Sequence, residues 1–543
     1  MKKDLLVIVV LLIGVSQSYS QSRGLKTITE QELRYHLDFL GAREFRGRET
    51  PSSELEIATL YIGNLAKHNG LKPLLKDGSF YQEVPLKVTA VSPAKTRLKI
   101  VKDGNESVYY FGKSFGGNFA SGGSYYGSVI FAGTGTEEMK NTDMRGKIIV
   151  IIDDQKPGSV AVSPWLTARM SERVAFFREK GASAVLSIPS PEKQARITAS
   201  SGFYEYIPTG RLGTLYDSQR TSFETSPSQT ATQERPILPF TFAEINQNLA
   251  TDLLGISVDE ISGLFASVRS GNNLVIKELS DTYVRLDVET DTYTAMSRNV
   301  IAVVEGSDPV LKNEYVVISG HHDGRGIDDG EIIAGADDNG TATVALMEIG
   351  QALLAERPKR SVILAWVTGE EQGMNGSHYF INNSPVPVEK ITACLDMDML
   401  GRNNTDSLFL VASDLLSSEL DESINKVNNK YGINFGFDYR YSDISHPQRV
   451  YFRSDHYPFL RFGIPSVWFF CGFTNDYHTY RDVPEYIDYV KFLKATKLVY
   501  LTAFDIGNMK NMLKLDVNPA VTSRGAHNLK EPSLYQVQQS EKK

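Results

Sequence analysis

Five apolar runs in the last third of the chain predict buried strands that alternate with helices. The runs are Val300 to Val304, Tyr315 to Ser319, Val362 to Val367, Ile391 to Leu395 and Pro465 to Phe470. Between the second and third runs, apolar positions from Val344 to Leu354 recur with helical spacing. Continuous apolar strands separated by helices are typical of sheets covered on both faces, so we expect an α/β fold with a mostly parallel sheet.

The N-terminal third begins with two predicted helices. Thr29 and Glu32 have the spacing of a capping box that opens the first helix. Asn69-Gly70 ends the second. From about Phe80 to Ser128, short alternating runs with Gly-Gly and Ser-Gly turns predict β-hairpins.

The middle third has a different pattern. The apolar runs Ile148 to Ile152 and Ala184 to Ile188 flank a helical stretch and predict a small βαβ-like unit. Residues 214–235, which follow, are rich in Ser, Thr and Gln. Because this third lacks the clustered His, Asp and Glu of the last third, we expect it to be a lid or spacer that performs no chemistry.

Composition fits a globular protein and excludes one class of partner. At about 150 residues per domain, 543 residues suggest three or so units. Hydrophobic residues make up 41% of the chain and charged residues 22%, which is enough for a large core. The formal net charge is −8 and no Lys/Arg cluster is present, so nucleic acid is not an expected partner.

The first twenty residues have the order of a secretory signal. Lys2 and Lys3 precede the apolar run Leu5 to Val15, which is too short to span a bilayer, and a small polar stretch follows. We therefore expect a cleaved signal peptide over 1–20 and export to the periplasm or the extracellular space, without stable membrane insertion. Cys394 and Cys471 are the only cysteines, and we expect both to be free and buried.

The candidate chemistry lies in polar motifs next to the apolar strands. In chain order the motifs are Gly320-His321-His322-Asp323, Gly335-Ala336-Asp337-Asp338-Asn339, Gly369-Glu370-Glu371, Asp396-Met397-Asp398 and Asp476-Tyr477-His478. Ligands of open α/β sheets gather beyond the carboxyl ends of the strands. So many carboxylates at one edge would repel one another unless a divalent metal were bound, and mixed His and carboxylate ligands suit zinc, with manganese or cobalt as alternatives.

Taken together, these motifs resemble the co-catalytic zinc exopeptidase family, which includes bacterial leucyl aminopeptidases, glutamate carboxypeptidase II and the transferrin receptor. The resemblance extends to Gly376-Ser377 and to the stretch from Ser454-Asp455-His456 to Gly463-Ile464-Pro465. The middle third is similar to the protease-associated domain that many members carry as an insertion. One departure is Thr341-Ala342, where many relatives have Ser-Gly.

The resemblance implies a three-layer α/β/α peptidase domain with an inserted, mainly-β protease-associated domain. The implied boundaries are 27–115 for the N-terminal part of the peptidase domain, 116–280 for the insertion, 281–514 for the catalytic domain and 515–543 for a polar tail.

The resemblance also implies a role for each site residue. Asp338 would bridge two zinc ions, with His321 and Asp398 completing one site and Glu371 and His478 the other. Asp337, Asp396 and His322 are the rivals that fit the family pattern less well. Glu370 would be the general base, Tyr477 would stabilise the oxyanion, and Asp323 would accept a hydrogen bond from His321.

These roles predict an exported di-zinc exopeptidase that acts on peptides, most simply an aminopeptidase. Three alternatives stay open: a carboxypeptidase or dipeptidase of the same family, a single-zinc glutaminyl cyclase, and a non-catalytic binding module. The sequence indicates neither the preferred side chain nor the oligomeric state.

Overall fold

The computed structural model describes residues 23–525 except 118, 120–121, 135–138, 140, 155–172, 174, 196–210, 215–239 and 329–330. The predicted signal peptide, nearly all of the stretch 214–235 and the end of the polar tail lie outside these residues. Within them, no helix combines the length and the apolar character needed to cross a bilayer.

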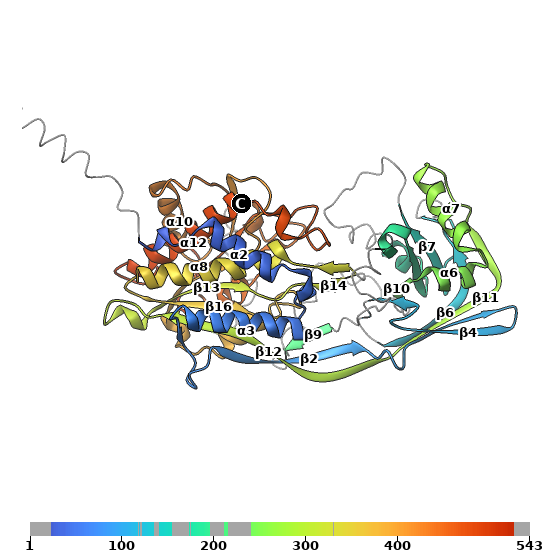
Figure 1. The fold of residues 1–543 in the computed structure, drawn as a ribbon, viewed down its shortest axis with the longest axis horizontal. Helices are drawn as coiled ribbons and strands as arrows, with labels where there is room; N and C mark the ends of the chain where they lie inside the picture. Colours follow the sequence, from blue (N-terminus) through green and yellow to red (C-terminus); the bar gives the residue numbers. More distant parts are fainter. Residues whose placement is uncertain are drawn as a thin grey trace, which may run out of the picture.

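A ten-stranded sheet forms the core of the larger part of the molecule (Figure 1), and its strands run in the order β19-β18-β20-β17-β13-β16-β12-β2-β9, with β1 on β12. The strands are β1 (Lys72–Pro73), β2 (Tyr81–Val91), β9 (Arg211–Thr214), β12 (Thr290–Val304), β13 (Tyr315–His321), β16 (Ser361–Val367), β17 (Ile391–Met397), β18 (Ser407–Val411), β19 (Gly436–Asp438) and β20 (Ser466–Phe470). The four strands β20, β17, β13 and β16 are parallel. Their carboxyl ends therefore meet at one edge, as the apolar runs predicted.

Helices cover both faces of this sheet and give three layers. One face carries α2 (Glu30–Leu40), α3 (Ser53–His68), α8 (Thr341–Ala355), α10 (Ser418–Lys430) and α12 (Tyr489–Asn508); the other carries α9 (Asn375–Asn382) and α11 (His456–Leu460). On β13, Val316 and Ile318 pack against the helices of the first face, and Val317 packs against those of the other face. Side chains alternate in this way because successive residues of a strand point to opposite sides of the sheet. The predicted α/β fold with both faces covered is confirmed.

A second, eight-stranded sheet lies beside the first (Figure 1), in the order β4-β3-β11-β6-β7-β8-β10-β5. It consists of β3 (Arg97–Lys102), β4 (Asn105–Tyr110), β5 (Phe115–Gly116), β6 (Gly123–Phe131), β7 (Ile148–Asp153), β8 (Ala184–Pro189), β10 (Thr241–Ile245) and β11 (Lys277–Val288), with α6 (Gln247–Leu254) and α7 (Val258–Arg269) packed on it. The parallel pair β7–β8 corresponds to the predicted βαβ-like unit. This sheet begins before the predicted boundary at 116 and ends after the one at 280.

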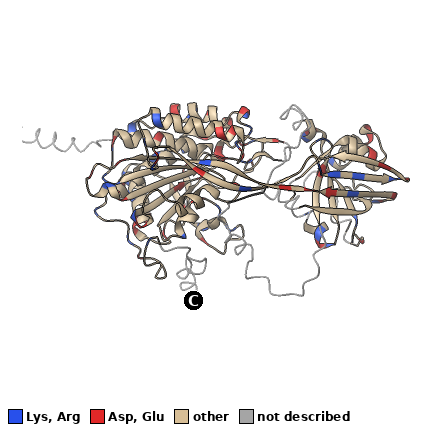
Figure 2. Cartoon of the chain, turned by 90° about the horizontal axis from the view of Figure 1, so that it is seen from below, with Lys and Arg blue, Asp and Glu red and all other residues tan. Residues whose placement is uncertain are grey.

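The two long strands β2 and β12, which pair antiparallel, extend from the first sheet toward the second, as Figure 2 shows from another direction. β12 starts ten residues before the predicted run at Val300, because its first half is partly exposed and pairs with β2 rather than entering the core. It also pairs antiparallel with β16, so this part of the sheet is not parallel. β9, from within the predicted insertion, pairs with β2 of the first sheet. Acidic and basic residues are interspersed along the described parts of both sheets and the helices packed on them (Figure 2).

The N-terminal helices start and end where the caps predict. The Thr29 hydroxyl accepts a hydrogen bond from the Glu32 backbone N–H and opens α2. The reciprocal bond from the Glu32 side chain, which would complete a capping box, is absent from the described hydrogen bonds. Ser52 caps α3, and Asn69 follows its last residue as predicted.

Candidate metal centre

The parallel strands bring their polar motifs to one edge of the first sheet. His321 is the last residue of β13 and is paired in register with Val367 at the end of β16. Asp398 directly follows β17, and the Glu370-Glu371 pair lies just beyond β16. His478 lies on the loop after β20, in a left-handed backbone conformation. The side chains are close in space because the carboxyl ends of parallel strands share an edge.

A tight turn before α8 positions Asp338. Gly335 has a φ of 65°, and both carboxylate oxygens of Asp482 accept backbone hydrogen bonds, from Asp337 N at 2.8 Å and Asp338 N at 3.0 Å. The buried Arg48 guanidinium donates to the carbonyl oxygen of Gly335 at 2.8 Å. These contacts hold the turn from both sides, so that the Asp338 carboxylate points toward the edge of the sheet.

Two groups of three side chains meet at this carboxylate. In the first group, the Nε2 atom of His321 lies 3.4 Å from Asp338 Oδ1 and 3.4 Å from Asp398 Oδ1. In the second, the Nε2 atom of His478 lies 3.0 Å from Asp338 Oδ2 and 3.4 Å from Glu371 Oε2. Asp338 belongs to both groups and offers a different oxygen to each.

The three rival residues point elsewhere. Asp337 accepts a hydrogen bond from Gly401 N at 2.7 Å and another from the Cys471 thiol at 3.3 Å. Asp396 accepts from the hydroxyls of two serines, Ser319 at 2.7 Å and Ser454 at 2.9 Å. Both nitrogens of the His322 ring are engaged, with Val367 O and the Thr59 hydroxyl, each at 2.9 Å. None of the three belongs to either group.

Glu370 lies beside the first group without joining it. Its Oε2 atom is 3.8 Å from His321 Nε2, and its backbone N–H donates to Asp323 Oδ1 at 3.2 Å. The Nδ1 atom of His321 is 3.1 Å from the main-chain oxygen of Asp323 and 3.5 Å from its carboxylate. His321 therefore donates to the backbone oxygen of Asp323, whereas the Asp323 carboxylate connects the Glu370 loop to the site.

Tyr477 stacks on the ring of His478, with 3.7 Å between centroids and 22° between planes. Its hydroxyl accepts a hydrogen bond from Arg453 Nη2 at 3.2 Å. Burial raises the pKa of Tyr477 well above 10, so the phenol stays protonated. It can donate a hydrogen bond to an anion that forms beside it.

The carboxylates and imidazoles of the two groups stabilise one another's charges. Burial lowers the pKa of His478, but the charges of Glu371 and Asp338 outweigh it and raise the pKa to about 9. For Asp338, burial opposes ionisation, and contacts with His321 and His478 reverse the effect and lower its pKa. Burial raises the pKa of Glu370 well above its ordinary value, and the charge of Asp398 adds to this although His321 opposes it.

The donor set fits a bound divalent cation. His321 Nε2, Asp398 Oδ1 and Glu371 Oε1 are buried and have no hydrogen-bond partner among the described residues. A buried polar atom without a partner is costly, and a metal ion would satisfy all three. One imidazole and two carboxylates in each group form the mixed N/O set that suits zinc.

Several residues that support the site were not predicted from the sequence. The Ser454 hydroxyl lies between Asp396 and Asp398, 2.9 Å from an oxygen of each, and can donate its single hydrogen to either carboxylate. The turn that carries Asp338 is held by Arg48 and Asp482, and the Tyr477 hydroxyl is positioned by Arg453. Ser454 and Arg453 stand at a quoted motif and could have been suspected, but Arg48 and Asp482 lie far from the motifs and carry no local signal.

Fold and site together define the class as a zinc-dependent exopeptidase with adjacent metal-ligating groups. Comparison with known families gives the same result, because residues 299–503 match the model of Peptidase family M28. The resemblance noted in the sequence is confirmed over these residues.

Individual relatives agree with this assignment. A probable zinc metalloprotease of Leptosphaeria maculans is 24% identical over 313 residues, which are 49% of this chain and 70% of that protein. A probable leucine aminopeptidase 2 of Aspergillus oryzae is 28% identical over 38% of this chain and 40% of its own length. The match to the Aspergillus protein thus spans less than half of that relative. A zinc aminopeptidase from Bacillus subtilis has the same fold, with a TM-score of 0.52, 14% identity and coverage of 92% of this chain and 98% of that one.

Proposed function

We propose that this protein is a di-zinc aminopeptidase, which removes N-terminal residues from peptides. In this proposal Asp338 would be shared by two zinc ions, His321 and Asp398 would hold one of them, and Glu371 and His478 would hold the other. The observation that carries the proposal is the position of Asp338, whose two oxygens face separate groups at 3.4 and 3.0 Å. A bridging carboxylate of this kind is what a two-metal centre requires.

Glu370 is the proposed general base. When bound, the metals supply Lewis acidity that lowers the pKa of water and polarises the peptide carbonyl. Glu370 belongs to neither ligand group yet lies beside His321, so its carboxylate is free to take a proton from the attacking water. It can then return that proton to the leaving amine.

Tyr477 and Asp323 have supporting roles in the proposal. The protonated Tyr477 hydroxyl, positioned by Arg453, would stabilise the developing oxyanion. Asp323 would fix the His321 ring through its backbone oxygen and hold the Glu370 loop through its carboxylate.

A polar pocket favours a second candidate, cleavage of short peptides by recognition of their C-terminal carboxylate. The pocket has a volume of about 530 Å³ and is lined by Arg402, Asn403, Thr474, Asn475, Asp476 and Arg481. Both guanidinium groups contact the single carboxylate of Asp476, two residues before His478. One positive charge is left over, which suits a carboxylate ligand.

A substrate panel tests both candidates. Zinc-loaded and chelator-treated protein would be assayed with aminoacyl, N-acyl-blocked, amidated and free-acid peptides, and with N-terminal glutamine peptides. An aminopeptidase requires a free N-terminus, accepts amidated peptides and loses its activity with the chelator. Rejection of amidated peptides would favour the second candidate, and cyclisation of N-terminal glutamine with one zinc per chain would overturn the proposal.

We further propose that the protein is exported. Support comes from the basic, apolar and small-residue order of residues 1–20. N-terminal sequencing of the mature protein from the exported fraction tests this, and a chain that stays inside the cell with Met1 intact would contradict it.

A further inference from the structure

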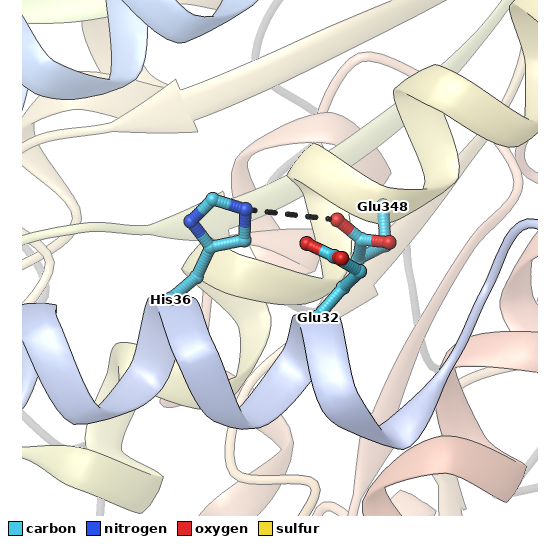
Figure 3. A group of neighbouring side chains, drawn as sticks. All are labelled: Glu32, His36 and Glu348. Atoms are coloured by element: carbon cyan, nitrogen blue, oxygen red, sulfur yellow. Dashed lines mark ion pairs between the residues drawn. The ribbon is translucent and has the colours of Figure 1, made fainter.

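Three side chains outside the catalytic edge meet between α2 and α8 (Figure 3). Glu32 and His36 are one turn apart on α2, and Glu348 projects from α8 toward them. One donor atom from each residue lies within 4.8 Å of the others, and His36 Nε2 is 3.9 Å from Glu348 Oε1. None of the three residues takes part in the proposed chemistry.

The Glu348 carboxylate is in an unfavourable place for a bare charge. Its side chain is 1% exposed, and its described hydrogen bond is to the Gln351 amide at 3.2 Å. No Lys or Arg of the described chain forms an ion pair with Glu348 or with Glu32. Burial, with the nearby charge of Glu32, raises the pKa of Glu348 to about 7. A cation at this position would stabilise the buried Glu348 carboxylate and offset its repulsion from Glu32.

The His36 ring is oriented like that of a metal ligand. Its side chain is 6% exposed, and its Nδ1 atom is 2.8 Å from the Tyr61 hydroxyl. Burial lowers the pKa of His36, which favours the neutral imidazole that metals bind. The Nε2 atom makes no hydrogen bond with any described residue and faces Glu348. Metal-binding histidines commonly hold one ring nitrogen in a hydrogen bond and present the other to the ion.

The position of Glu32 is a third, independent sign. Glu32 occupies the position from which a capping-box side chain reaches back to the N-cap residue, but that bond is absent among the described residues. Its carboxylate lies with His36 and Glu348 instead (Figure 3).

We propose that Glu32, His36 and Glu348 bind one divalent ion of the zinc class, separate from the catalytic metals. One imidazole and two carboxylates suit zinc, whereas calcium and magnesium prefer oxygen ligands alone. His36 Nε2 and Glu348 Oε1 are 3.9 Å apart, whereas the nitrogen–oxygen pairs of the catalytic groups are 3.0–3.4 Å apart, so a shared ion would draw α2 and α8 together. The ion clamps the N-terminal helix to α8, which begins at the turn that carries Asp338. A clamp between segments distant in sequence stabilises the folded state.

Zinc content and thermal unfolding test this site without an activity assay. The wild type would be compared with Glu348→Gln and Glu32→Gln, and with Glu30→Gln as a matched control on the exposed side of α2. We expect the wild type and the control to bind about one zinc more per chain than the two site variants. Titration with Zn²⁺ should raise the Tm of the wild type and the control further than that of the site variants, and Ca²⁺ should not.

Equal zinc content and equal zinc-dependent Tm in all four proteins would overturn the proposal. If Glu348→Gln does not fold, Glu32→Gln decides, because Glu32 is exposed and glutamine also suits the third position of a helix. In crystals of the zinc-loaded protein, an anomalous peak at the zinc edge between His36 and Glu348 would support the site. A map with peaks at the catalytic edge alone would overturn it.

Discussion

Glu370 and Glu371 are consecutive residues with different surroundings. The Oε2 atom of Glu371 is 3.4 Å from His478, within a ligand group, whereas Glu370 lies beside His321 and outside both groups. Both residues lie in the turn after β16, where the Glu370 carbonyl accepts hydrogen bonds from Gly373 N and Met374 N, so a single turn supplies both a ligand and a base.

We predict that Glu370→Gln keeps its zinc and loses most of its activity. The amide has a similar shape but cannot accept the proton, and general bases contribute about 10²–10⁴-fold to the rate. We expect the loss in kcat with little change in KM. Steady-state kinetics and elemental analysis measure both quantities.

Glu371→Gln is the matched control for this prediction. It should lose part of its zinc, and added metal should restore some of its rate. If both variants lost zinc equally, or if Glu370→Gln kept its full activity, the two roles would be wrongly assigned.

The turn before α8 is the element on which the site depends. Thr341 donates a hydrogen bond to Asp337 O at 2.9 Å and accepts one from Leu400 N at 3.1 Å. Ala342 packs against Gly320, where an added Cβ would lie 2.8 Å from the Cβ of Ala342. The Thr341-Ala342 departure from the family pattern is thus accommodated behind the turn, and the direction of Asp338 is unaffected.

We predict that Gly335→Ala destabilises this turn and weakens metal binding. Gly335 has a φ of 65°, and an added Cβ would lie 2.5 Å from the backbone oxygen of Asp338. Gly432→Ala is the control, since φ there is 66° and the space around it is open. In the control, the left-handed conformation alone should lower the free energy of unfolding by about 1–2 kcal/mol. Gly335→Ala should cost more and reduce zinc content, and equal Tm values for the two variants would contradict this.

At the scale of the whole molecule, metal removal should make stability depend on pH. In the metal-free protein the pKa of His478 is about 9, above its ordinary value of 6.5. Its contribution to stability is therefore fully present below about pH 6.5 and is lost as the pH rises through about 9. Burial raises the pKa values of Asp455 and Asp482 from 3.8 to about 7, so these groups lower stability as the pH rises between those values, mostly below the range in which His478 acts.

We predict that the Tm of the metal-free protein falls between pH 6.5 and 9, and that the zinc-loaded protein changes less because the cation replaces the protons. His478→Gln should make the fall of Tm with pH shallower. The control His68→Gln, at an exposed histidine, should leave it unchanged. Scanning calorimetry across this range checks the prediction, and a rising Tm in the metal-free protein would refute it.

The second sheet can be removed at a defined point, together with β9 at the edge of the first sheet. Ser92 N donates to Glu289 O at 2.7 Å, so an Asn-Gly turn could join these residues in place of 93–288. We predict that the shortened protein cleaves small aminoacyl substrates at a rate within about threefold of wild type, or about 0.65 kcal/mol in activation free energy, because the removed residues include none of the proposed site. Long peptides should lose more, because the second sheet would shape access to the site. Equal rates on substrates of every length would leave it as a spacer.

The sequence by itself determined the strands, the helices and the order of the polar motifs. These features follow from local signals: continuous apolar runs for β13, β16, β17 and β20, the cap Thr29 for α2, and Asn69-Gly70 for the end of α3. Because parallel strands must end at one edge, those signals were enough to predict that the motifs gather there, and the family resemblance selected His321, Glu371 and Asp398 within them.

Only the tertiary structure decided which way the neighbouring carboxylates face. Asp337 and Asp338 differ because Asp482, far along the chain, fixes their backbone, and because Gly401 engages Asp337. The antiparallel course of β12, the place of β9 in the first sheet and the contact of Arg453 with Tyr477 likewise depend on distant partners. Hydrophobic pattern is a property of a short segment, but side-chain direction and strand register depend on contacts between segments.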